Sequence, residues 1–316
     1  MVLNFSKVLV TGGAGFIGSH IVDRLLDEGI NVRVLDNLST GDKKNISHHK
    51  NKKGFQFIQG DIRNFSQVKK AIKGIEAVVH QAALVSVTRS VEDPIISNEI
   101  NVKGTLNLLK ASIDANVKRF VFASSCAVYG DTKTLPNKED SIPKPLSPYA
   151  ADKLAAENYA TVFNKIYGLE TVSLRYYNVY GPRQKYGPYS GVISIFINNI
   201  LQNNPLTIFG NGEQQRDFVN VKDVIEANLF ALTKKEAVGN VFNVGTAKPT
   251  TINKIAEIIK KITNKKSVKT VHAKPKQGNI KQSYADITKI QKSLGYKPNI
   301  QIEEGLNELI KWYSNQ

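Results

Sequence analysis

Residues 7–18 decide the fold, and they read Lys7-Val8-Leu9-Val10-Thr11-Gly12-Gly13-Ala14-Gly15-Phe16-Ile17-Gly18. The apolar run Ser6–Val10 predicts a short buried strand. A helix from about Phe16 to Glu28 is expected directly after it, because one helical face collects Ile17, Ile21, Leu25 and Leu26. The stretch therefore predicts a strand, a glycine-rich turn and a helix in succession.

The three glycines of this turn predict a dinucleotide site. Gly12 permits the tight turn, Gly15 lets the backbone approach a pyrophosphate, and Gly18 lets the helix pack closely on the strand. The phosphates are expected at the helix N-terminus, where free N–H groups and the helix dipole favour anions.

A second predicted strand, residues 32–37, ends in Asp36 and Asn37. We expect Asp36 to bind the adenosine ribose hydroxyls and to disfavour a 2′-phosphate, so that NAD is preferred over NADP. The alternative role for Asp36 is to cap a helix or a turn.

Two more strands continue the pattern. Residues 55–63 predict a third strand with Asp61 at its carboxyl end, where ligands bind in a doubly wound sheet and where adenine is expected. Residues 77–83 predict a fourth strand that ends in small residues, as the close approach of a dinucleotide requires. We expect His80, inside this strand, to be a packed or capping side chain rather than a catalyst.

Farther along, the chain brings hydroxyl groups and a lysine into one arrangement. Ser124 and Ser125 end an apolar run that predicts another buried parallel strand. Tyr149 and Lys153 are four residues apart in a helix expected over about Tyr149–Lys165, so they lie on one helical face. A lysine ammonium there is expected to lower the tyrosine pKa from about 10 towards working pH, which makes a general base. The pair alone also occurs by chance on helix surfaces, but its position after a strand-end serine and a cofactor turn is specific.

Composition restricts the class of protein. The chain has 316 residues, 41% of them hydrophobic, which suits one large domain or two joined ones with a substantial core. Its one cysteine, Cys126, excludes an internal disulfide and fits a reducing compartment. The sequence has no long apolar run and no signal-peptide pattern, so we expect a cytoplasmic protein that does not bind a membrane.

The formal net charge is +16, and much of it lies near the C-terminus. From Lys234 onward, sixteen lysines and no arginine stand against six acidic residues, a net charge of +10. These lysines are scattered on expected helix faces without interleaved aromatic residues, which favours a solvated face over a nucleic-acid site. A polyanionic small substrate such as a nucleotide diphosphate could use part of this field.

These residues resemble the extended short-chain dehydrogenase/reductase family and, within it, the UDP-hexose (UDP-glucose/UDP-N-acetylglucosamine) 4-epimerases. The resemblance extends over nearly the whole chain. The motifs that carry it are Thr11–Gly18, Asp36-Asn37, Asp61-Ile62, His80-Gln81-Ala82-Ala83, Asn101, Ser124-Ser125, the pair Tyr149 and Lys153, Leu174–Pro182, and Arg216-Asp217-Phe218-Val219.

The resemblance implies NAD as cofactor, a UDP-sugar as substrate, no metal and no nucleic acid. It implies that Tyr149 acts as base and acid, that Lys153 holds the nicotinamide ribose, and that Ser125 hydrogen-bonds the reacting hydroxyl. The implied cofactor contacts are Gly12, Gly15, Phe16, Ile17, Gly18, Asp36, Asn37, Asp61, Ile62, Gln81, Ala82, Ala83, Asn101, Tyr149, Lys153 and Tyr177. The implied substrate contacts are Ser86, Ser124, Ser125, Asn178, Gly191, Val192, Arg216, Lys276, Asn279 and Ser283.

In family members the tyrosine removes the proton of the sugar 4-OH while hydride passes from C4 to NAD. The 4-keto sugar then turns over, and hydride returns to its other face. In relatives, helices equivalent to about Asn98–Ala115 and Tyr149–Lys165 form a four-helix dimer interface. The apolar stripes here are compatible with it, so a homodimer is expected.

Two departures from the family pattern bear on the substrate and the reaction. Relatives often carry Arg-x-Gly-Asp where this chain has Lys276-Gln277-Gly278-Asn279, so UDP is the expectation but the nucleotide stays open. Cys126-Ala127 stand where 4,6-dehydratases carry acidic residues and UDP-glucuronate decarboxylases a glutamate. The absence of those acids favours epimerisation.

The resemblance also bears on the size of the sugar. Ser283 and Gly191 occupy positions that wall the sugar pocket in relatives, and small residues there leave room for an N-acetyl group. Val85 stands where a relative that prefers N-acetylated sugars has glycine, so acceptance of both sugar types is expected rather than exclusive preference.

The expected fold is α/β, a doubly wound parallel-sheet Rossmann domain with a smaller mixed α/β substrate domain. Residues 1–180, with a return segment near 217–245, form the NAD-binding domain, and the remaining segments of 181–316 form the substrate-binding domain. Expected elements in the second half are an apolar segment at 192–197, a strand at 241–245 and helices at 252–262 and 302–313, with a short helix before Tyr296-Lys297-Pro298.

Two other functions remain possible from the sequence. One is another nucleotide-sugar enzyme of this fold, a dehydratase, reductase or decarboxylase. The other is a non-catalytic relative that binds NAD or nucleic acid, against which the intact set of Ser125, Tyr149 and Lys153 argues.

Overall fold

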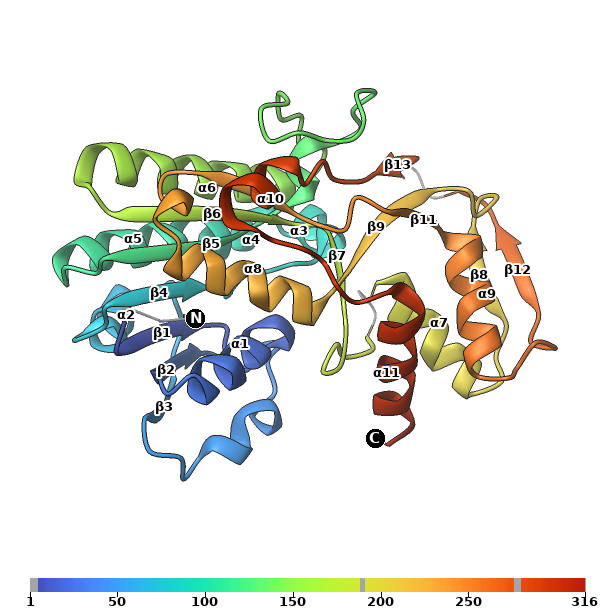
Figure 1. The fold of residues 1–316 in the computed structure, drawn as a ribbon, viewed down its shortest axis with the longest axis horizontal. Coiled ribbons are helices and arrows are strands. Elements are labelled where there is room, and N and C mark those ends of the chain that lie inside the picture. The colour runs from blue at the N-terminus through green and yellow to red at the C-terminus, as the bar shows by residue number, and fades with distance from the viewer. Residues whose placement is uncertain (1–4, 188–190, 276–279, 316) are drawn as a thin grey trace.

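A parallel sheet of seven strands forms the centre of the computed structural model, which describes residues 5–187, 191–275 and 280–315 (Figure 1). The strands lie in the order β10-β6-β5-β4-β1-β2-β3. Their bounds are β1 Lys7–Thr11, β2 Asn31–Asp36, β3 Phe55–Gln59, β4 Ala77–His80, β5 Arg119–Ser125, β6 Glu170–Tyr176 and β10 Val241–Val244. The expected Rossmann-type α/β fold is confirmed.

The direction of winding reverses between β1 and β4. From β1 the chain builds outward through β2 and β3 on one side, and then through β4, β5 and β6 on the other. In such a sheet ligands bind beyond the carboxyl ends of the strands at this reversal. The residues that follow β1 and β4 are the glycine turn and the segment that begins with Gln81.

Helices cover both faces of this sheet because successive strand residues point to opposite sides. Val8 and Val10 pack in one core, together with side chains of α1 Phe16–Asp27, α8 Val221–Thr233 and α10 Thr288–Leu294. Leu9 packs in the other core, with side chains of α2 Phe65–Ile72, α5 Gly104–Asp114 and α6 Pro148–Tyr167. The continuous apolar strand runs are therefore buried on both faces.

A smaller part of the molecule is built around β9 Gln215–Asn220. This strand pairs in parallel with β7 Asn178–Tyr180 and β13 Gln282–Ser283, and antiparallel with β11 Pro249–Thr251. A separate parallel pair joins β8 Leu206–Phe209 to β12 Thr270–Ala273.

Three helices and these strands enclose a third core. The helices are α7 Val192–Leu201, α9 Ile252–Ile262 and α11 Ile302–Ser314, which Figure 1 shows grouped at one end of the molecule. Helix α9 has the bounds expected from its isoleucine pattern, and its N-terminus is capped by Thr251, whose hydroxyl accepts from the amide of Lys254.

Several elements differ from their expected bounds. The third strand ends at Gln59 and the fourth at His80, so Asp61 and the small residues after His80 lie in loops. The helix expected over 98–115 is instead α4 Pro94–Asn98, a π-helical turn Glu99–Lys103, and α5. The apolar stripe expected for this segment, which lies after the π-helical turn, does not reveal this break, because a single π-helical turn has no sequence signature of its own.

The C-terminal region also contributes to the first core. Ile290 and Leu294 of α10 pack beside α8 and β10, although the sequence assigns this segment to the substrate-binding part. Helix α10 ends before Gly295, whose φ of 75° places it in the left-handed region. The other short helices are α3 Val87–Glu92 and the 3₁₀ helices Lys43–His49, Cys126–Tyr129 and Lys235–Ala237. Among the described helices, none combines the length and apolarity needed to cross a bilayer.

Candidate active site

The glycine turn after β1 leaves space and donors for a phosphate group. Gly12 has a φ of 67°, and a Cβ on it would lie 2.7 Å from the amide nitrogen of Ala82. A Cβ on Gly18 would lie 2.2 Å from the carbonyl oxygen of Gly12, so helix α1 packs against the turn only with glycine there. No side chain caps α1, which leaves the first N–H groups of the helix for a ligand. These features fit the pyrophosphate of NAD.

Asp36 ends β2 beside this turn. Its carboxylate accepts hydrogen bonds from the amides of Ala14 at 3.0 Å and Leu38 at 2.8 Å. Burial raises the pKa of Asp36, and these two hydrogen bonds partly offset the effect. The carboxylate is thus held in one orientation at the carboxyl edge of the sheet.

Asn37 and Asp61 meet at the neighbouring strand ends. The side-chain amide of Asn37 donates to Asp61 at 3.0 Å, and Arg63 forms an ion pair with the same carboxylate at 2.8 Å. Arg63 is the main reason that the pKa of Asp61 falls to about 2. Ile62, which separates Asp61 from Arg63 in the chain, is buried against α5. The expected adenosine residues therefore lie together.

The segment after β4 is fixed by side chains on both flanks. Gln81 donates to the hydroxyl of Tyr176 at 2.9 Å. The side chain of Asn101, in the π-helical turn, accepts a hydrogen bond from the amide of Leu84 at 2.9 Å and donates one to the carbonyl oxygen of Leu84 at 3.1 Å. Ala82 and Ala83 lie between these anchors in the chain, and Ala82 lies beside Gly12.

The catalytic residues expected from the sequence are brought together between β5 and α6. The hydroxyl of Ser125 lies close enough to that of Tyr149 to lower the tyrosine pKa. Lys153, one helical turn after Tyr149, donates from Nζ to the carbonyl oxygen of Ala123 at 2.8 Å. Helix α6 is positioned by Ser147, whose side chain accepts from the amide of Ala150 and so caps the N-terminus.

The expected lowering of the Tyr149 pKa by Lys153 is wrong. Burial raises the pKa of Tyr149 to about 12, and the nearby hydroxyl of Ser125 offsets only part of this. Burial also lowers the pKa of Lys153 to about 7. A buried site disfavours phenolate and ammonium alike, so spacing on a helix could not settle which effect wins.

Ser124 points to the other side of the strand from Ser125. Its hydroxyl donates to Glu157 at 2.6 Å, and Glu157 in turn binds Arg175 at 2.6 Å, with all three side chains buried. Arg175 also donates to the hydroxyl of Tyr129 at 2.8 Å. The sequence did not predict this cluster, although Glu157 continues the four-residue spacing of Tyr149 and Lys153.

The substrate side of the site comes from the second sheet. Ser283 of β13 pairs in register with Arg216 of β9. The side chains of Ser283 and Arg216 both lie close enough to Cys126, which follows the catalytic Ser125, to lower the pKa of its thiol. Burial raises the pKa of Cys126 to about 12, so this thiol stays protonated. Two residues from distant sequence therefore reach the end of β5.

The remaining expected contacts are placed as follows. Tyr177 is buried just after β6, and Asn178 begins β7 with its side chain exposed. Gly191 caps α7 and Val192 is its first residue, while Ser86 caps α3 by accepting from the amide of Arg89 at 3.1 Å. Lys276 and Asn279 lie outside the described residues.

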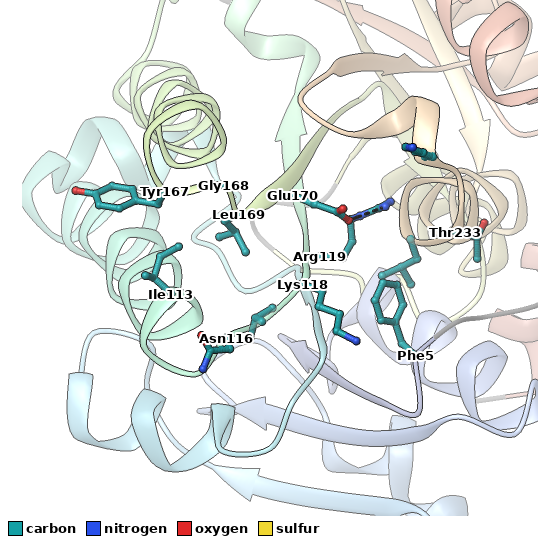
Figure 2. Close-up of a pocket in the computed structure, with 13 residues that line it drawn as sticks. Phe5, Ile113, Asn116, Lys118, Arg119, Tyr167, Gly168, Leu169, Glu170 and Thr233 are labelled. Atoms are coloured by element: carbon teal, nitrogen blue, oxygen red, sulfur yellow. Dashed lines mark hydrogen bonds and ion pairs between the residues drawn. The ribbon is translucent and has the colours of Figure 1, made fainter.

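A cavity of about 580 Å³ lies at the opposite end of the sheet (Figure 2). Lys118 and Arg119 at the start of β5, and Glu170 at the start of β6, line it, and Arg119 pairs with Glu170 at 2.9 Å. None of the expected site residues lines this cavity, so it is separate from the catalytic end.

One group in the described residues brings three side chains of metal-binding type together. Donor atoms of Asp23, His48 and His49 lie within 4.8 Å of one another on the outer side of α1. Asp23 is already engaged, because Arg183 forms an ion pair with it at 2.7 Å. A guanidinium at this distance disfavours a second cation.

Comparisons with known proteins agree with this geometry. A model of the NAD dependent epimerase/dehydratase family matches residues 8–245. The UDP-glucose 4-epimerase of Thermotoga maritima, solved with UDP-glucose, is 39% identical with a TM-score of 0.93, covering 98% of this chain and 99% of the other. The UDP-N-acetylglucosamine 4-epimerase of Methanobrevibacter ruminantium, in complex with UDP-N-acetylmuramic acid, is 40% identical with a TM-score of 0.94, again covering 98% and 99%. A dTDP-glucose 4,6-dehydratase of Streptomyces venezuelae with NAD bound is 31% identical, with a TM-score of 0.90 and coverage of 98% and 97%.

Proposed function

Because the chain belongs to the NAD-dependent epimerase/dehydratase family, we propose that it inverts C4 of both UDP-glucose/UDP-galactose and UDP-N-acetylglucosamine/UDP-N-acetylgalactosamine. At the level of the family it is an NAD-dependent UDP-sugar 4-epimerase, an isomerase. The observation that carries the proposal is the juxtaposition of Ser125 at the end of β5 with Tyr149 on α6, and with Lys153 one helical turn after Tyr149.

NAD, when bound, would supply the hydride chemistry at C4 of the sugar. Tyr149 removes the proton of the 4-OH through its phenol oxygen and gives a proton back after the sugar has turned over. Ser125 is proposed to hydrogen-bond the same sugar hydroxyl. Lys153, which is held at β5 by its hydrogen bond to the carbonyl oxygen of Ala123, is proposed to hold the nicotinamide ribose.

The side chains next to the catalytic serine support epimerisation over elimination. Cys126 and Ala127 occupy the start of the 3₁₀ helix that follows β5, and neither offers a base that could remove the proton from C5 of a sugar at neutral pH. A dehydratase or decarboxylase of this fold needs an acid at this place, as the family resemblance implies.

The acceptance of N-acetylated sugars rests on two small residues. Ser283 is a short side chain beside Cys126, at the end of the catalytic strand. A Cβ on Gly191 would meet no atom within 4 Å. Val85 is 67% exposed, so it adds apolar surface near α3 without filling a core. These features support room for a substituent on C2 of the sugar.

The nucleotide diphosphate is proposed to lie on Arg216 and Asn178, with Lys276 and Asn279 as further contacts. Arg216 is on the central strand of the second sheet, and Asn178 is on the strand beside it. An arginine offers paired donors to a diphosphate. UDP is proposed as the nucleotide on the strength of the two similar epimerases.

A homodimer in the cytoplasm is part of the proposal. Helix α6 exposes Tyr159, Val162 and Ile166, by 40%, 46% and 71%, on the side away from its buried catalytic residues. A second copy that packs on this face would remove the apolar surface from water. The single cysteine fits a reducing compartment.

The function is tested by incubating the purified protein with UDP-glucose, UDP-N-acetylglucosamine and UDP-glucuronate and following each sugar by proton NMR. Inversion at C4 of the first two is expected. A 4-keto-6-deoxy product or loss of carbon dioxide would overturn epimerisation. Turnover of UDP-glucuronate alone would overturn the substrate range.

A further inference from the structure

His80 is fully buried and contacts two hydroxyl groups at the end of β4. Its Nδ1 lies 2.7 Å from the hydroxyl of Thr11, and its Nε2 lies 2.9 Å from the hydroxyl of Thr105. Burial lowers the pKa of His80 to about 3, and the nearby charge of Lys153 adds to this. The ring is therefore neutral at any working pH, with one nitrogen protonated.

The neighbouring hydrogen bonds determine which nitrogen carries the proton. Thr105 donates its single hydroxyl proton to the carbonyl oxygen of Asn101 at 2.6 Å. The Thr105 oxygen can then only accept from His80, so Nε2 is the protonated nitrogen. Nδ1 is left as an acceptor and receives the hydroxyl proton of Thr11.

The same logic extends the chain of hydrogen bonds by one more link. The oxygen of Thr11 accepts from the amide of Ala82 at 3.3 Å. The result is a relay in one direction, Ala82 amide to Thr11, to His80, to Thr105, to the carbonyl of Asn101. Every donor and acceptor in it is used once, which is the condition under which a buried polar network stabilises a structure.

This relay joins three segments that surround the expected pyrophosphate. Thr11 ends β1 and begins the glycine turn, Ala82 follows β4, and Asn101 belongs to the π-helical turn. Asn101 also fixes Leu84 through its side-chain amide. A Cβ on Gly12 would lie 2.7 Å from the amide nitrogen of Ala82, so the glycine turn and the segment after β4 are already packed as closely as their backbones allow.

We propose that His80 is a positioning residue for the cofactor, which acts through this relay to hold the glycine turn and residues 81–84 at the separation that NAD requires. The inference rests on NAD as the cofactor and not on which sugar is turned over. The imidazole itself touches neither the cofactor nor the substrate in this role.

The test measures NAD affinity of the full chain without any sugar. Thr105→Val keeps the shape of the side chain but removes both hydrogen bonds. When NAD is absent, the segments can relax so that water reaches the polar groups left without a partner. Bound NAD requires the original arrangement, so the free-energy cost of those groups lowers the NAD affinity. We expect NAD affinity to fall by about 5- to 150-fold, the range that corresponds to one buried group left unsatisfied.

Thr171→Val is the matched control. Thr171 is an equally buried threonine whose hydroxyl donates to Ala160, at a site on β6 away from the turn. This variant should lose stability but keep its NAD affinity within about 2-fold. Equal NAD affinity of the two threonine variants would overturn the proposal.

Two further measurements separate the relay from simple packing. His80→Phe keeps a ring in the same volume without hydrogen bonds, and it should bind NAD more weakly than His80→Gln, which can still donate to Thr105. In a sample labelled with ¹⁵N-histidine, His80 should show a protonated Nε2 and an unprotonated Nδ1 that do not change between about pH 5 and about pH 9. A protonated Nδ1, a titrating ring, or full NAD affinity of His80→Phe would each contradict the role. Loss of sugar turnover with intact NAD binding would instead count against the proposed sugar chemistry.

Discussion

The ammonium group of Lys153 is joined to the carbonyl oxygen of Ala123 by a hydrogen bond of 2.8 Å. This contact ties the catalytic helix α6 to β5 one residue before the two serines. No other hydrogen bond is described for the Lys153 side chain, although it is fully buried. Burial lowers the pKa of Lys153 to about 7, so near neutral pH the side chain carries a proton only part of the time. Besides this carbonyl oxygen, the buried ammonium is compensated by the nearby charge of Asp152 and by the ring of Phe122, whose centroid lies 4.9 Å from Nζ.

Replacing Lys153 by Met should stabilise the NAD-free protein most at low pH. An unfolded lysine keeps its proton up to about pH 10.5, whereas the folded one loses it near pH 7. Between these values the unfolded state binds more protons, so the stability contributed by Lys153 rises with pH. The gain in Tm from Lys153→Met should be larger at about pH 6 than at about pH 9. Lys165→Met, an exposed position on α6, should show no such difference; equal gains at both pH values would contradict the burial argument.

Replacing Tyr149 by Phe should remove the proton carrier and leave the ring packing intact. Loss of a general acid–base group lowers turnover by about 10²- to 10⁴-fold. NAD content and Tm should stay close to those of the unmodified protein, because only the hydroxyl group is removed. Tyr167→Phe, at an exposed position on the same helix, is the control and should turn over normally. Normal turnover by Tyr149→Phe would make the tyrosine structural.

Replacing Asp36 by Ala should weaken NAD and relax discrimination against NADP. Hydrogen bonds to a charged group contribute about 1.5–3 kcal/mol, so NAD affinity should fall by about 10- to 150-fold. NADP should gain relative to NAD because the repulsion between carboxylate and 2′-phosphate is gone. Titrations with both cofactors measure the ratio, and Asp27→Ala, at the end of α1, controls for the change in net charge. An unmodified protein that binds both cofactors equally would contradict the assignment.

Replacing Ser283 by Tyr should abolish turnover of UDP-N-acetylgalactosamine and spare UDP-galactose. A phenol ring next to Cys126 would occupy the space that an N-acetyl group needs while the keto sugar rotates. Ser283→Ala keeps the space and should turn over both sugars, which separates volume from hydrogen bonding. The two rates are followed by proton NMR. If the unmodified protein leaves UDP-N-acetylgalactosamine untouched, Val85 is the first residue to replace by glycine.

Replacing Ile166 by Asp should convert a homodimer into monomers. Ile166 is 71% exposed on α6, and a carboxylate in the centre of an apolar contact would be desolvated without a partner. Light scattering at micromolar concentration reports the mass. Ile142→Asp alters a residue of similar exposure in the proline-rich loop and should remain dimeric. An unmodified protein that scatters as a monomer would refute the assembly.

The first half of the fold could be predicted because its signals are local. The strand around Val8, the helix from Phe16 and the helix that carries Tyr149 each have a continuous pattern, and the structure has them within about two residues. Strands β3 and β4 end earlier than predicted, at Gln59 and His80, because the residues that follow leave the ladder for the loops at the carboxyl edge of the sheet.

The second half gave weaker signals for a physical reason. Strands such as Pro249–Thr251 and Gln282–Ser283 are too short for any alternation to be recognised, and they exist because β9 supplies a partner. The pairing of Ser283 with Arg216 is a tertiary fact of this kind. The residues next to Ser283 and Arg216 in the chain do not indicate that these two residues pair.

The chemistry of the site could also be predicted only in part. The association of Ser125 with Tyr149 followed from the order of motifs, whereas the ionisation of Tyr149 and Lys153 depends on burial that no spacing reveals. The cluster of Glu157 with Arg175 was missed because a buried ion pair looks like two surface charges in a sequence.

The passage of the chain from β9 into α8 means that neither half can be cut out as an independent folding unit. Strand β9 is the centre of the second sheet, while Val219, Val221 and the helix that follows belong to the first core. A fragment that stops after Tyr180 would lack α8, β10 and α10, and would expose both the β6 edge and one sheet face to water. Such a fragment should aggregate rather than fold, and proteases should degrade the intact protein in one cooperative event rather than release a stable half.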